Sequence, residues 1–282
     1  MLDYTIKYHT ENSYENPVTE AFWQYLVTPE TNDNQEVILS RYFTSVNSRI
    51  EQSINGYGFE TARIHCKKPF SEIIFDAEFK IQKLEFNPFG FTDSESPEKD
   101  YELMQSLEFR SEHESYLKAT ALTKLSDHES QLFTFDKSQS VFNNLNALHE
   151  WVYHFINFEA GVTNVNTKLS EIIALKKGVC QDFTHLFCAL SRANSVPCRY
   201  VSGYLHQGQG YFGDSQMHAW AEAFIPNIGW MGFDTTNKLL VNHNHIKVAH
   251  GKDYDDCPPI KGIVYSTGKN FTKYSVEVSQ QQ

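Results

Sequence analysis

The sequence has no long hydrophobic run and no targeting segment. No stretch of its 282 residues approaches the roughly 18 consecutive apolar residues that suggest a transmembrane helix. The opening residues, MLDYTIKYHTENSYENP, contain neither the basic region nor the apolar run of a secretory signal peptide. We therefore expect a cytoplasmic protein that does not act at a membrane.

Cysteine is scarce, and its spacing argues against two kinds of site. The five cysteines are odd in number and irregularly spaced, and no CxxC pair occurs. This pattern does not fit a disulfide framework or a structural zinc site, although one oxidised pair stays open. The spacing of Cys180, His185 and Cys188 does not suit zinc either, so we expect no metal and no other cofactor. The cysteines are Cys66, Cys180, Cys188, Cys198 and Cys257.

Positive charge is also in short supply. Lys and Arg number 24 against 35 Asp and Glu, which gives a net charge of −11, and no block of basic residues occurs. Nucleic-acid binders and proteins of anionic membranes carry the opposite signature, so neither partner is expected. Hydrophobic residues make up 40% of the chain, enough for a packed core, and a chain of this length fits about two domains.

The first half of the chain alternates between apolar and polar residues, as strands with one buried face do. A stretch rich in Pro, Gly, Ser and acidic residues, 87–100, then predicts a loop. We assign residues 1–135 to a β-rich N-terminal domain. The clearest alternation places Ile73, Phe75, Ala77, Phe79 and Ile81 on one face.

Beyond residue 135 the apolar period becomes helical and then returns to that of strands. Residues 136–282 are therefore expected to form helices packed on an antiparallel sheet, and the whole chain is assigned to the α+β class. Gly208, Gly210 and Gly213 predict a loop over the site. Helices are expected over 141–155, from Thr167 to Lys177 and from Cys180 onward, and strands over 198–202, 217–225 and 230–235.

Cys180 is the best candidate nucleophile. It follows Gly178-Val179 and stands in the first turn of a predicted helix, where the positive end of the helix dipole favours thiolate over thiol. A thiolate is the nucleophile of covalent acyl chemistry. A buried cysteine at a helix start is more often a small apolar residue, so Cys180 needs partners before catalysis is the better interpretation.

His218 and Asp234 supply those partners. His218 opens a predicted strand and can act as the base near neutral pH. Asp234 ends the next strand, where it can orient the imidazole and stabilise its charged form. Two antiparallel strands joined by the turn 226–229 bring both residues to the open end of the hairpin.

Three ordered motifs resemble the transglutaminase-like superfamily. GVCQDF surrounds Cys180, MHAWAEAFIPNIGWMGFDTTN carries His218 and Asp234, and HIKVAHGKDYDDCPPIK resembles the family's C-terminal signature. The pattern is that of the bacterial branch described as cysteine proteases, and the β-rich opening region is similar to the N-terminal domain of that branch. The resemblance implies a papain-like core with Cys180 as nucleophile, His218 as base and Asp234 as orienting acid.

Other residues near these motifs have weaker claims. Gln181, Asp182 and Trp220 are candidates for a supporting role around the site, with helix capping or packing at least as plausible. His243 and His245 are expected at the surface. The Cys180 backbone N–H is the first candidate oxyanion donor, because amides in the first helical turn lack intrahelical partners.

The sequence leaves three functions open. An amide hydrolase or peptidase would resolve the thioester with water, and we favour it because no calcium or second-substrate signature is visible. A transglutaminase would use an amine instead, after the same first step. A catalytically silent binding module is the third possibility. The expected partner is a peptide or protein substrate with an amide group, and the oligomeric state is undetermined.

Overall fold

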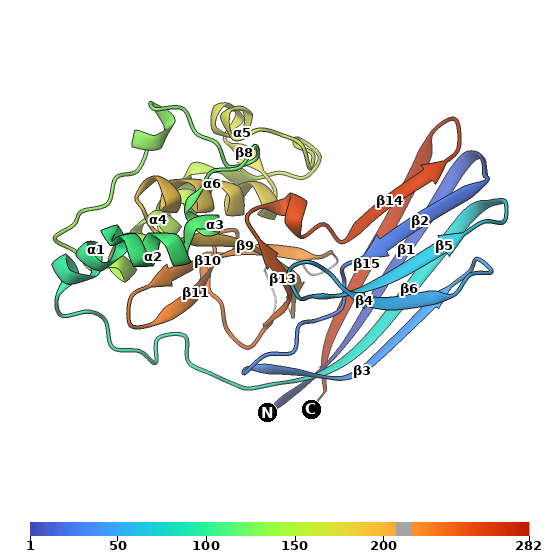
Figure 1. Cartoon of the computed structure of the whole chain (residues 1–282), viewed down its shortest axis with the longest axis horizontal. Coiled ribbons are helices and arrows are strands. Elements are labelled where there is room, and N and C mark those ends of the chain that lie inside the picture. The colour runs from blue at the N-terminus through green and yellow to red at the C-terminus, as the bar shows by residue number, and fades with distance from the viewer. Residues whose placement is uncertain (207–215, 282) are drawn as a thin grey trace.

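The computed structural model describes residues 1–206 and 216–281, arranged as a helical lobe and a β-sandwich (Figure 1). Gly208, Gly210 and Gly213, for which a loop over the site is predicted, lie outside the described residues. Within the described residues, no helix has the length and apolar character needed to cross a bilayer. The combination of helices with antiparallel sheets confirms the α+β prediction.

The β-sandwich consists of two four-stranded antiparallel sheets. In the first sheet the strand order is β15 (Asn270–Gln281), β1 (Leu2–Val18), β6 (Phe70–Lys83) and β3 (Gln35–Thr44). In the second sheet the order is β14 (Ile260–Tyr265), β2 (Glu20–Tyr25), β5 (Glu60–Cys66) and β4 (Ile50–Ile54).

Strand β6 shows why this sequence makes a sandwich. Its odd-numbered residues from Ile73 to Ile81 are all buried, and they face the core between the two sheets. Asp76, Glu78 and Lys80 alternate with them on the wetter face. The period of two predicted for 73–81 is thus confirmed, and burial of these side chains is the main force that holds the two sheets together.

The predicted division at residue 135 does not follow the sheets. Strands β14 and β15 return from the C-terminus to pair with β2 and β1, so the sandwich contains both ends of the chain (Figure 1). Helices α1 (Pro97–Gln105), α2 (Leu107–Glu112) and α3 (Glu114–Leu117) lie before the predicted boundary, yet Tyr101, Met104 and Phe109 belong to the core of the helical lobe. The sequence of a terminal strand does not reveal which distant strand it pairs with.

The helical lobe is built on a five-stranded antiparallel sheet. Apolar residues on one face of this sheet, including Ala221, Ala223 and Phe233, pack against helices α4 and α6. The strand order is β12 (Leu239–Leu240), β11 (Gly229–Asp234), β10 (His218–Ile225), β9 (Cys198–Leu205) and β13 (His245–Gly251). The remaining elements are α4 (Val141–Phe155), α5 (Leu169–Leu175), α6 (Cys180–Ala193), β7 (Asn157–Phe158), β8 (Lys177–Gly178) and the short 3-10 helices η1 (Glu129–Gln131) and η2 (Tyr254–Asp256).

Most predicted elements of this lobe are confirmed, with two local exceptions. Helix α5 begins after Lys168 instead of being capped by Thr167, whose hydroxyl accepts the Asn164 N–H at 2.9 Å instead. It ends where Lys176 turns into the left-handed region (φ 52°), two residues before Gly178. The predicted loop 87–100 also extends too far, because helix α1 already begins at Pro97, a residue well suited to a first helical turn.

Strand β13 joins the two halves. It pairs with β9 on one side, and its Lys247 carbonyl accepts the Glu30 N–H of the sandwich at 2.9 Å. The Tyr204 hydroxyl of β9 donates to the Val27 carbonyl at 2.5 Å. Because Tyr204 is buried in the same core as the sandwich residues, the two halves share one continuous interior at this junction.

Candidate functional site

Cys180 is the first residue of helix α6, as predicted, and it is half-buried. The turn that leads into it is held by Asp182, whose carboxylate accepts the Val179 N–H at 2.7 Å and the Thr163 hydroxyl at 2.6 Å. A Cβ on Gly178 would lie 2.5 Å from the Asp182 carboxylate. Glycine is therefore required there for the chain to pass so close to the group that fixes the nucleophile's helix.

His218 begins strand β10 and is fully buried. Its Nε2 donates to Asp234 Oδ2 at 2.8 Å. Its Nδ1 has no hydrogen-bond partner of ordinary geometry among the described residues, and the Cys180 thiol lies close enough to interact with the ring. Hydrogen bonds between catalytic groups are often long before substrate binds. The arrangement leaves Nδ1 as the ring atom available to Cys180.

Asp234, the last residue of β11, accepts hydrogen bonds through all of its oxygens. Oδ1 accepts the backbone N–H groups of Thr236 and Asn237, at 3.1 and 3.2 Å. Oδ2 accepts the Asn237 side-chain amide at 2.8 Å in addition to His218. The carbonyl accepts His149 Nε2 from helix α4 at 2.9 Å. A carboxylate held by this many donors is kept ionised and fixed in orientation.

The protonation of the pair follows from these contacts. Burial alone lowers the pKa of His218, but the Asp234 carboxylate and then the Cys180 thiol outweigh it, and the pKa rises to about 10. Burial raises the pKa of Asp234, yet His218 and His245 hold it well below its usual range. These shifts favour an imidazolium at His218 paired with the Asp234 carboxylate, beside the Cys180 sulfur.

His245 is not at the surface, so that prediction was wrong. It opens the buried strand β13, and its Nε2 lies 3.1 Å from Asp234 Oδ2. The alternation of Ile246 and Val248 indicates a strand, but a sheet of unknown order does not say that its first residue reaches Asp234. Asn237 was missed as well, although an Asp side chain that accepts the backbone N–H two residues on, as Asp234 does with Thr236, is a common turn pattern.

The three supporting candidates occupy different places. The Gln181 side-chain amide donates to the Val165 carbonyl at 3.3 Å. Asp182 acts on the turn before Cys180, as described above. Trp220 is buried, with its ring 5.3 Å from that of His245 and 6.4 Å from that of His218. Of the three, Trp220 alone packs against both histidines, and all three roles stay predictions.

One group of side chains has the composition of a metal site. Ligand atoms of His218, Asp234 and His245 lie within 4.8 Å of one another. Both histidine nitrogens already lie at hydrogen-bonding distance from Asp234 Oδ2, so protons account for the geometry. The other candidate zinc ligands were Cys180, His185 and Cys188. Of these, His185 Nε2 accepts the Tyr254 N–H, and Cys188 Sγ lies 3.5 Å from Cys198 Sγ, so both side chains already have other partners.

Comparison with known proteins finds a family model that matches the segment carrying these residues. The model of the transglutaminase-like superfamily matches residues 132–235, a segment that includes Cys180, His218 and Asp234. This segment is a transglutaminase-like core.

The transglutaminase-like core lies in a chain whose relatives extend over nearly its full length. An uncharacterised protein of Mycobacterium leprae is 28% identical over 274 residues, covering 95% of each chain. One from Mycobacterium tuberculosis is 27% identical over 281 residues, covering 95% of this chain and 89% of its own. The crystal structure of a "Putative Cysteine Protease" from Cytophaga hutchinsonii has the same fold, with a TM-score of 0.72 at 21% identity, over 100% of this chain and 91% of that one.

Proposed function

We propose that this protein is a thiol-dependent acyl-transfer enzyme that cleaves amide bonds, as a cysteine peptidase or amidase does. One observation carries the proposal. Cys180 begins a helix beside the His218 ring. In the same buried site, His218 donates a hydrogen bond from Nε2 to Asp234, which leaves Nδ1 for Cys180. The order of nucleophile, base and orienting acid, and their contacts, support covalent catalysis by a thiol.

In the first half of the reaction, the Cys180 thiolate, whose proton has passed to His218 Nδ1, attacks the carbonyl carbon of the amide. The carbonyl oxygen gains negative charge, and the Cys180 backbone N–H is the natural first donor to it, because amides at a helix start lack intrahelical partners, whereas the Asp182 and Phe183 N–H groups already donate to the Val179 carbonyl. The C–N bond then breaks as His218 Nδ1 gives its proton to the leaving amine. The products of this half are a thioester on Cys180, a free amine and a neutral His218.

In the second half, water attacks the thioester carbonyl while His218 Nδ1 takes its proton. The C–S bond breaks, the acid is released, and Cys180 again faces a protonated His218. Asp234 keeps its charge throughout and holds the ring in the orientation that both proton transfers need. An amine acceptor in place of water would make the same protein a transglutaminase.

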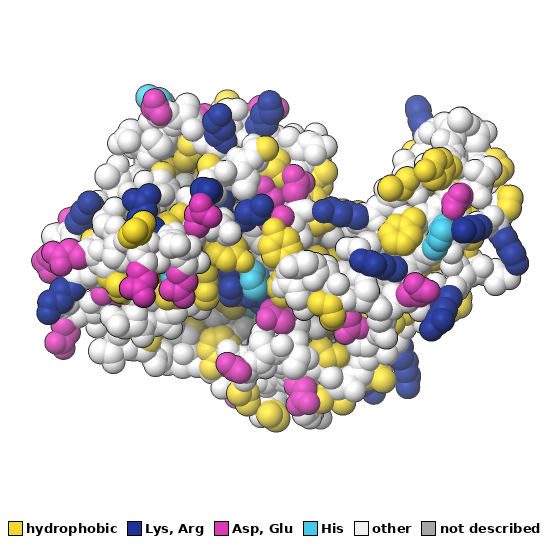
Figure 2. Space-filling model, in the orientation of Figure 1, with side chains coloured by type: hydrophobic (Ala, Val, Ile, Leu, Met, Phe, Trp, Pro, Cys, Tyr) yellow, Lys and Arg dark blue, Asp and Glu magenta, His cyan; other side chains and the backbone are white. Residues whose placement is uncertain are grey.

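The proposal also covers partner and location. We propose a peptide or protein substrate that presents an amide group, in the cytoplasm. On the face shown in Figure 2, acidic and basic side chains are interspersed, and the surface is hollowed between the helical lobe and the sandwich. This distribution, with a net charge of −11, is unlike the single-signed basic surface of a nucleic-acid binder.

Labelling with electrophilic peptide and glutamine-analogue probes, followed by mapping of the modified residue, tests the proposal. We expect modification at Cys180 and none in Cys180→Ala, because the other four cysteines are buried. A glutamine-containing protein offered with a labelled primary amine then distinguishes the acceptors. Release of ammonia or new chain termini indicates water, and dominant incorporation of the amine indicates a transglutaminase. Absence of any Cys180-dependent reaction would leave the binding module as the better account.

A further inference from the structure

We propose that His245 is a fourth member of this site, a neutral positioning residue that donates Nε2–H to Asp234, and that the β-sandwich holds it in place. The inference deepens the proposed function and rests on it. Strand β13 carries His245, and side chains of the sandwich hydrogen-bond to the main chain of its first residues.

The hydrogen bonds around His245 fix its tautomer. Asp234 Oδ2 can only accept, so Nε2 carries a proton, and in the neutral ring Nδ1 accepts the Asn242 backbone N–H at 3.3 Å; a charged ring would instead donate to Asn242 Oδ1, which lies 3.4 Å away. The proton of a neutral ring then sits on Nε2, which faces Asp234 Oδ2 at 3.1 Å. His245 can therefore donate to Asp234 without carrying a charge, whereas His218 donates to the same oxygen as an imidazolium.

The surroundings of His245 favour this neutral form. Burial lowers its pKa, and the attraction of the Asp234 carboxylate is opposed by positive charge on His218 and on Lys83. A second imidazolium on one carboxylate would leave a surplus buried cation, which is costly. A neutral donor instead adds a hydrogen bond and leaves the single charge of Asp234 to His218.

The sandwich reaches His245 through its backbone. Lys83, the last residue of β6, donates its ammonium to the His245 carbonyl and to Gln35 Oε1 at 3.3 Å. Gln35 in turn donates to the Lys247 carbonyl at 2.7 Å and accepts the Lys247 N–H at 3.1 Å. Two side chains of the sandwich thus fix the main chain of β13 on either side of Ile246.

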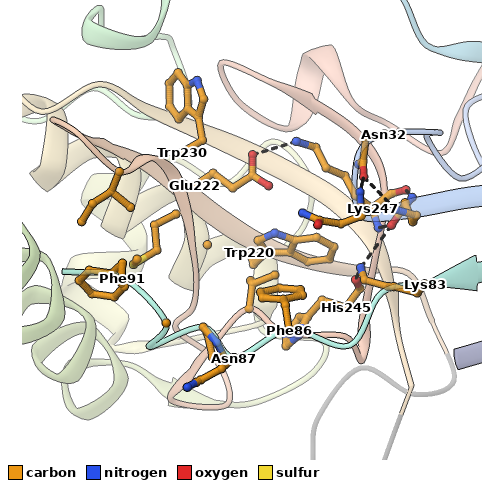
Figure 3. Close-up of a pocket in the computed structure, with 18 residues that line it drawn as sticks. Asn32, Lys83, Phe86, Asn87, Phe91, Trp220, Glu222, Trp230, His245 and Lys247 are labelled. Carbon is orange, nitrogen blue, oxygen red and sulfur yellow. Dashed lines mark hydrogen bonds and ion pairs between the residues drawn. The ribbon is translucent and has the colours of Figure 1, made fainter. Parts of the chain in front are cut away.

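These side chains gather around one pocket. Figure 3 shows Lys83, His245 and Lys247 close together at one end of it, with Trp220 in the wall. The Trp220 ring packs edge-on against that of His245. Lys83 of the sandwich therefore holds the main chain of His245 by a hydrogen bond. Trp220 packs against its ring, and its Nε2 faces Asp234.

The consequence for catalysis is geometric. A carboxylate that holds a histidine must keep its plane, because a displacement of about 1 Å in the reacting groups can lower a rate by about 100-fold. Oδ1 of Asp234 is fixed by its own turn, whereas Oδ2 depends on side chains. Among the described residues, Oδ2 accepts from His218, Asn237 and His245, and His245 is the donor carried by β13, the strand that the sandwich contacts.

Two substitutions separate this role from simple packing. His245→Gln retains an N–H donor, and His245→Leu retains bulk without one. Near pH 6, we expect the leucine variant to lose about 10-fold to 100-fold in the rate of Cys180 alkylation and the glutamine variant to stay within about 3-fold of wild type. His250→Gln, in the same strand but without contact to the triad, is the matched control and is expected to alkylate at the wild-type rate. Equal losses in the leucine and glutamine variants would overturn the proposal.

The wild-type protein offers a test that does not depend on a variant folding. In ¹⁵N-histidine NMR spectra, His245 is expected to be a neutral Nε2–H tautomer near neutral pH, with its N–H proton shifted downfield by Asp234. A charged ring or an Nδ1–H tautomer would contradict the proposal. This measurement needs no substrate, so it tests His245 separately from the enzyme activity. A contradictory spectrum would leave the proposed activity intact, and the expected spectrum could also be found if the protein were a catalytically silent binding module.

The contribution of the sandwich is tested at Lys83. Lys83→Met is expected to slow Cys180 alkylation by about 3-fold to 10-fold, less than His245→Leu, because Gln35 still holds β13. Lys80→Met, at an exposed position on the same strand, is the control and is expected to have no effect. An unchanged rate in Lys83→Met would remove the sandwich from the proposal.

Discussion

The β10–β11 hairpin and strand β13 bring one histidine each to the same oxygen of Asp234, with opposite results. His218 from the hairpin has its pKa raised to about 10, and His245 from β13 has its pKa lowered. Both are fully buried and both hydrogen-bond to Oδ2. Burial and the shared carboxylate therefore do not explain the difference.

The other neighbours of each ring do explain it. His218 has a thiol on its free side, a group that can share or take negative charge. His245 has the His218 ring and the Lys83 ammonium nearby, both of which oppose a further positive charge. One carboxylate can thus hold a charged base and a neutral support at once, because their remaining contacts differ in sign.

The largest expected effect comes from removing the shared charge. Asp234→Asn keeps the shape of the side chain but leaves buried His218 without its counter-ion, so the pKa of His218 falls and its tautomer is no longer fixed. We expect Cys180 labelling by a peptide probe to slow by about 10³-fold to 10⁴-fold. His149→Gln, which affects only the Asp234 carbonyl, should stay within about 10-fold of wild type. Comparable losses in both variants would mean that packing, not charge, matters at Asp234.

A smaller effect is expected on the side of β13, away from the triad. Glu222 lies between Arg199 and Lys247, with Oε2 at 2.6 Å and 2.8 Å from their nitrogens. Glu222→Gln removes the carboxylate that these cations share, leaves Lys247 only the longer contact with Glu30 at 3.8 Å, and should lower the free energy of unfolding by about 3 kcal/mol. Urea denaturation measures this.

The control for that substitution is an exposed ion pair. Glu277→Gln breaks a surface contact with Lys7 at 3.7 Å and should leave the urea midpoint unchanged. Equal midpoints for the Glu222 and Glu277 variants would show that the charges at the junction contribute nothing to stability.

The smallest effect is a slope of stability against pH. The pKa of His218 is raised from 6.5 to about 10, so its stabilisation is complete below pH 6.5 and declines above it. Between pH 6.5 and 8 the native protein binds more protons at this site, and the contribution of this site to the free energy of unfolding should fall by up to about 1.4 kcal/mol per pH unit. His218→Gln should remove this slope, and a slope that persists would contradict the assignment.

The slope is read as the difference between wild type and His218→Gln, because other groups titrate in or near the same window. Lys83, with its pKa lowered from 10.5 to about 8, makes stability rise with pH above that value. Buried histidines whose pKa is lowered contribute a rise that continues through pH 6.5 and is complete by about pH 7.5. These histidines are His149, His185, His245 and His250.

Local signals in the sequence were sufficient for the hairpin and for α6. His218 and Asp234 are 16 residues apart around a short turn, so antiparallel pairing alone places them near each other. Cys180 was found because a helix start has a recognisable pattern. In each case the decisive contacts join residues whose positions follow from one element and its neighbour.

The contacts that were missed join residues far apart in the chain. His245 reaches Asp234 only because β13 pairs with β9, beside β10. Lys83 meets His245 across 162 positions, and β15 meets β1 at opposite ends of the chain. Such pairings are set by the burial of whole sheets, for which a single sequence contains no local signal.

The most direct test of the central claim is the rate of Cys180 alkylation by iodoacetamide between about pH 5 and 8. An imidazolium beside the thiol favours the reactive thiolate. The account predicts that Cys180 reacts faster than a free thiol across this range and that His218→Ala removes the advantage. A wild-type rate that follows the free thiol throughout, unchanged in His218→Ala, would contradict it.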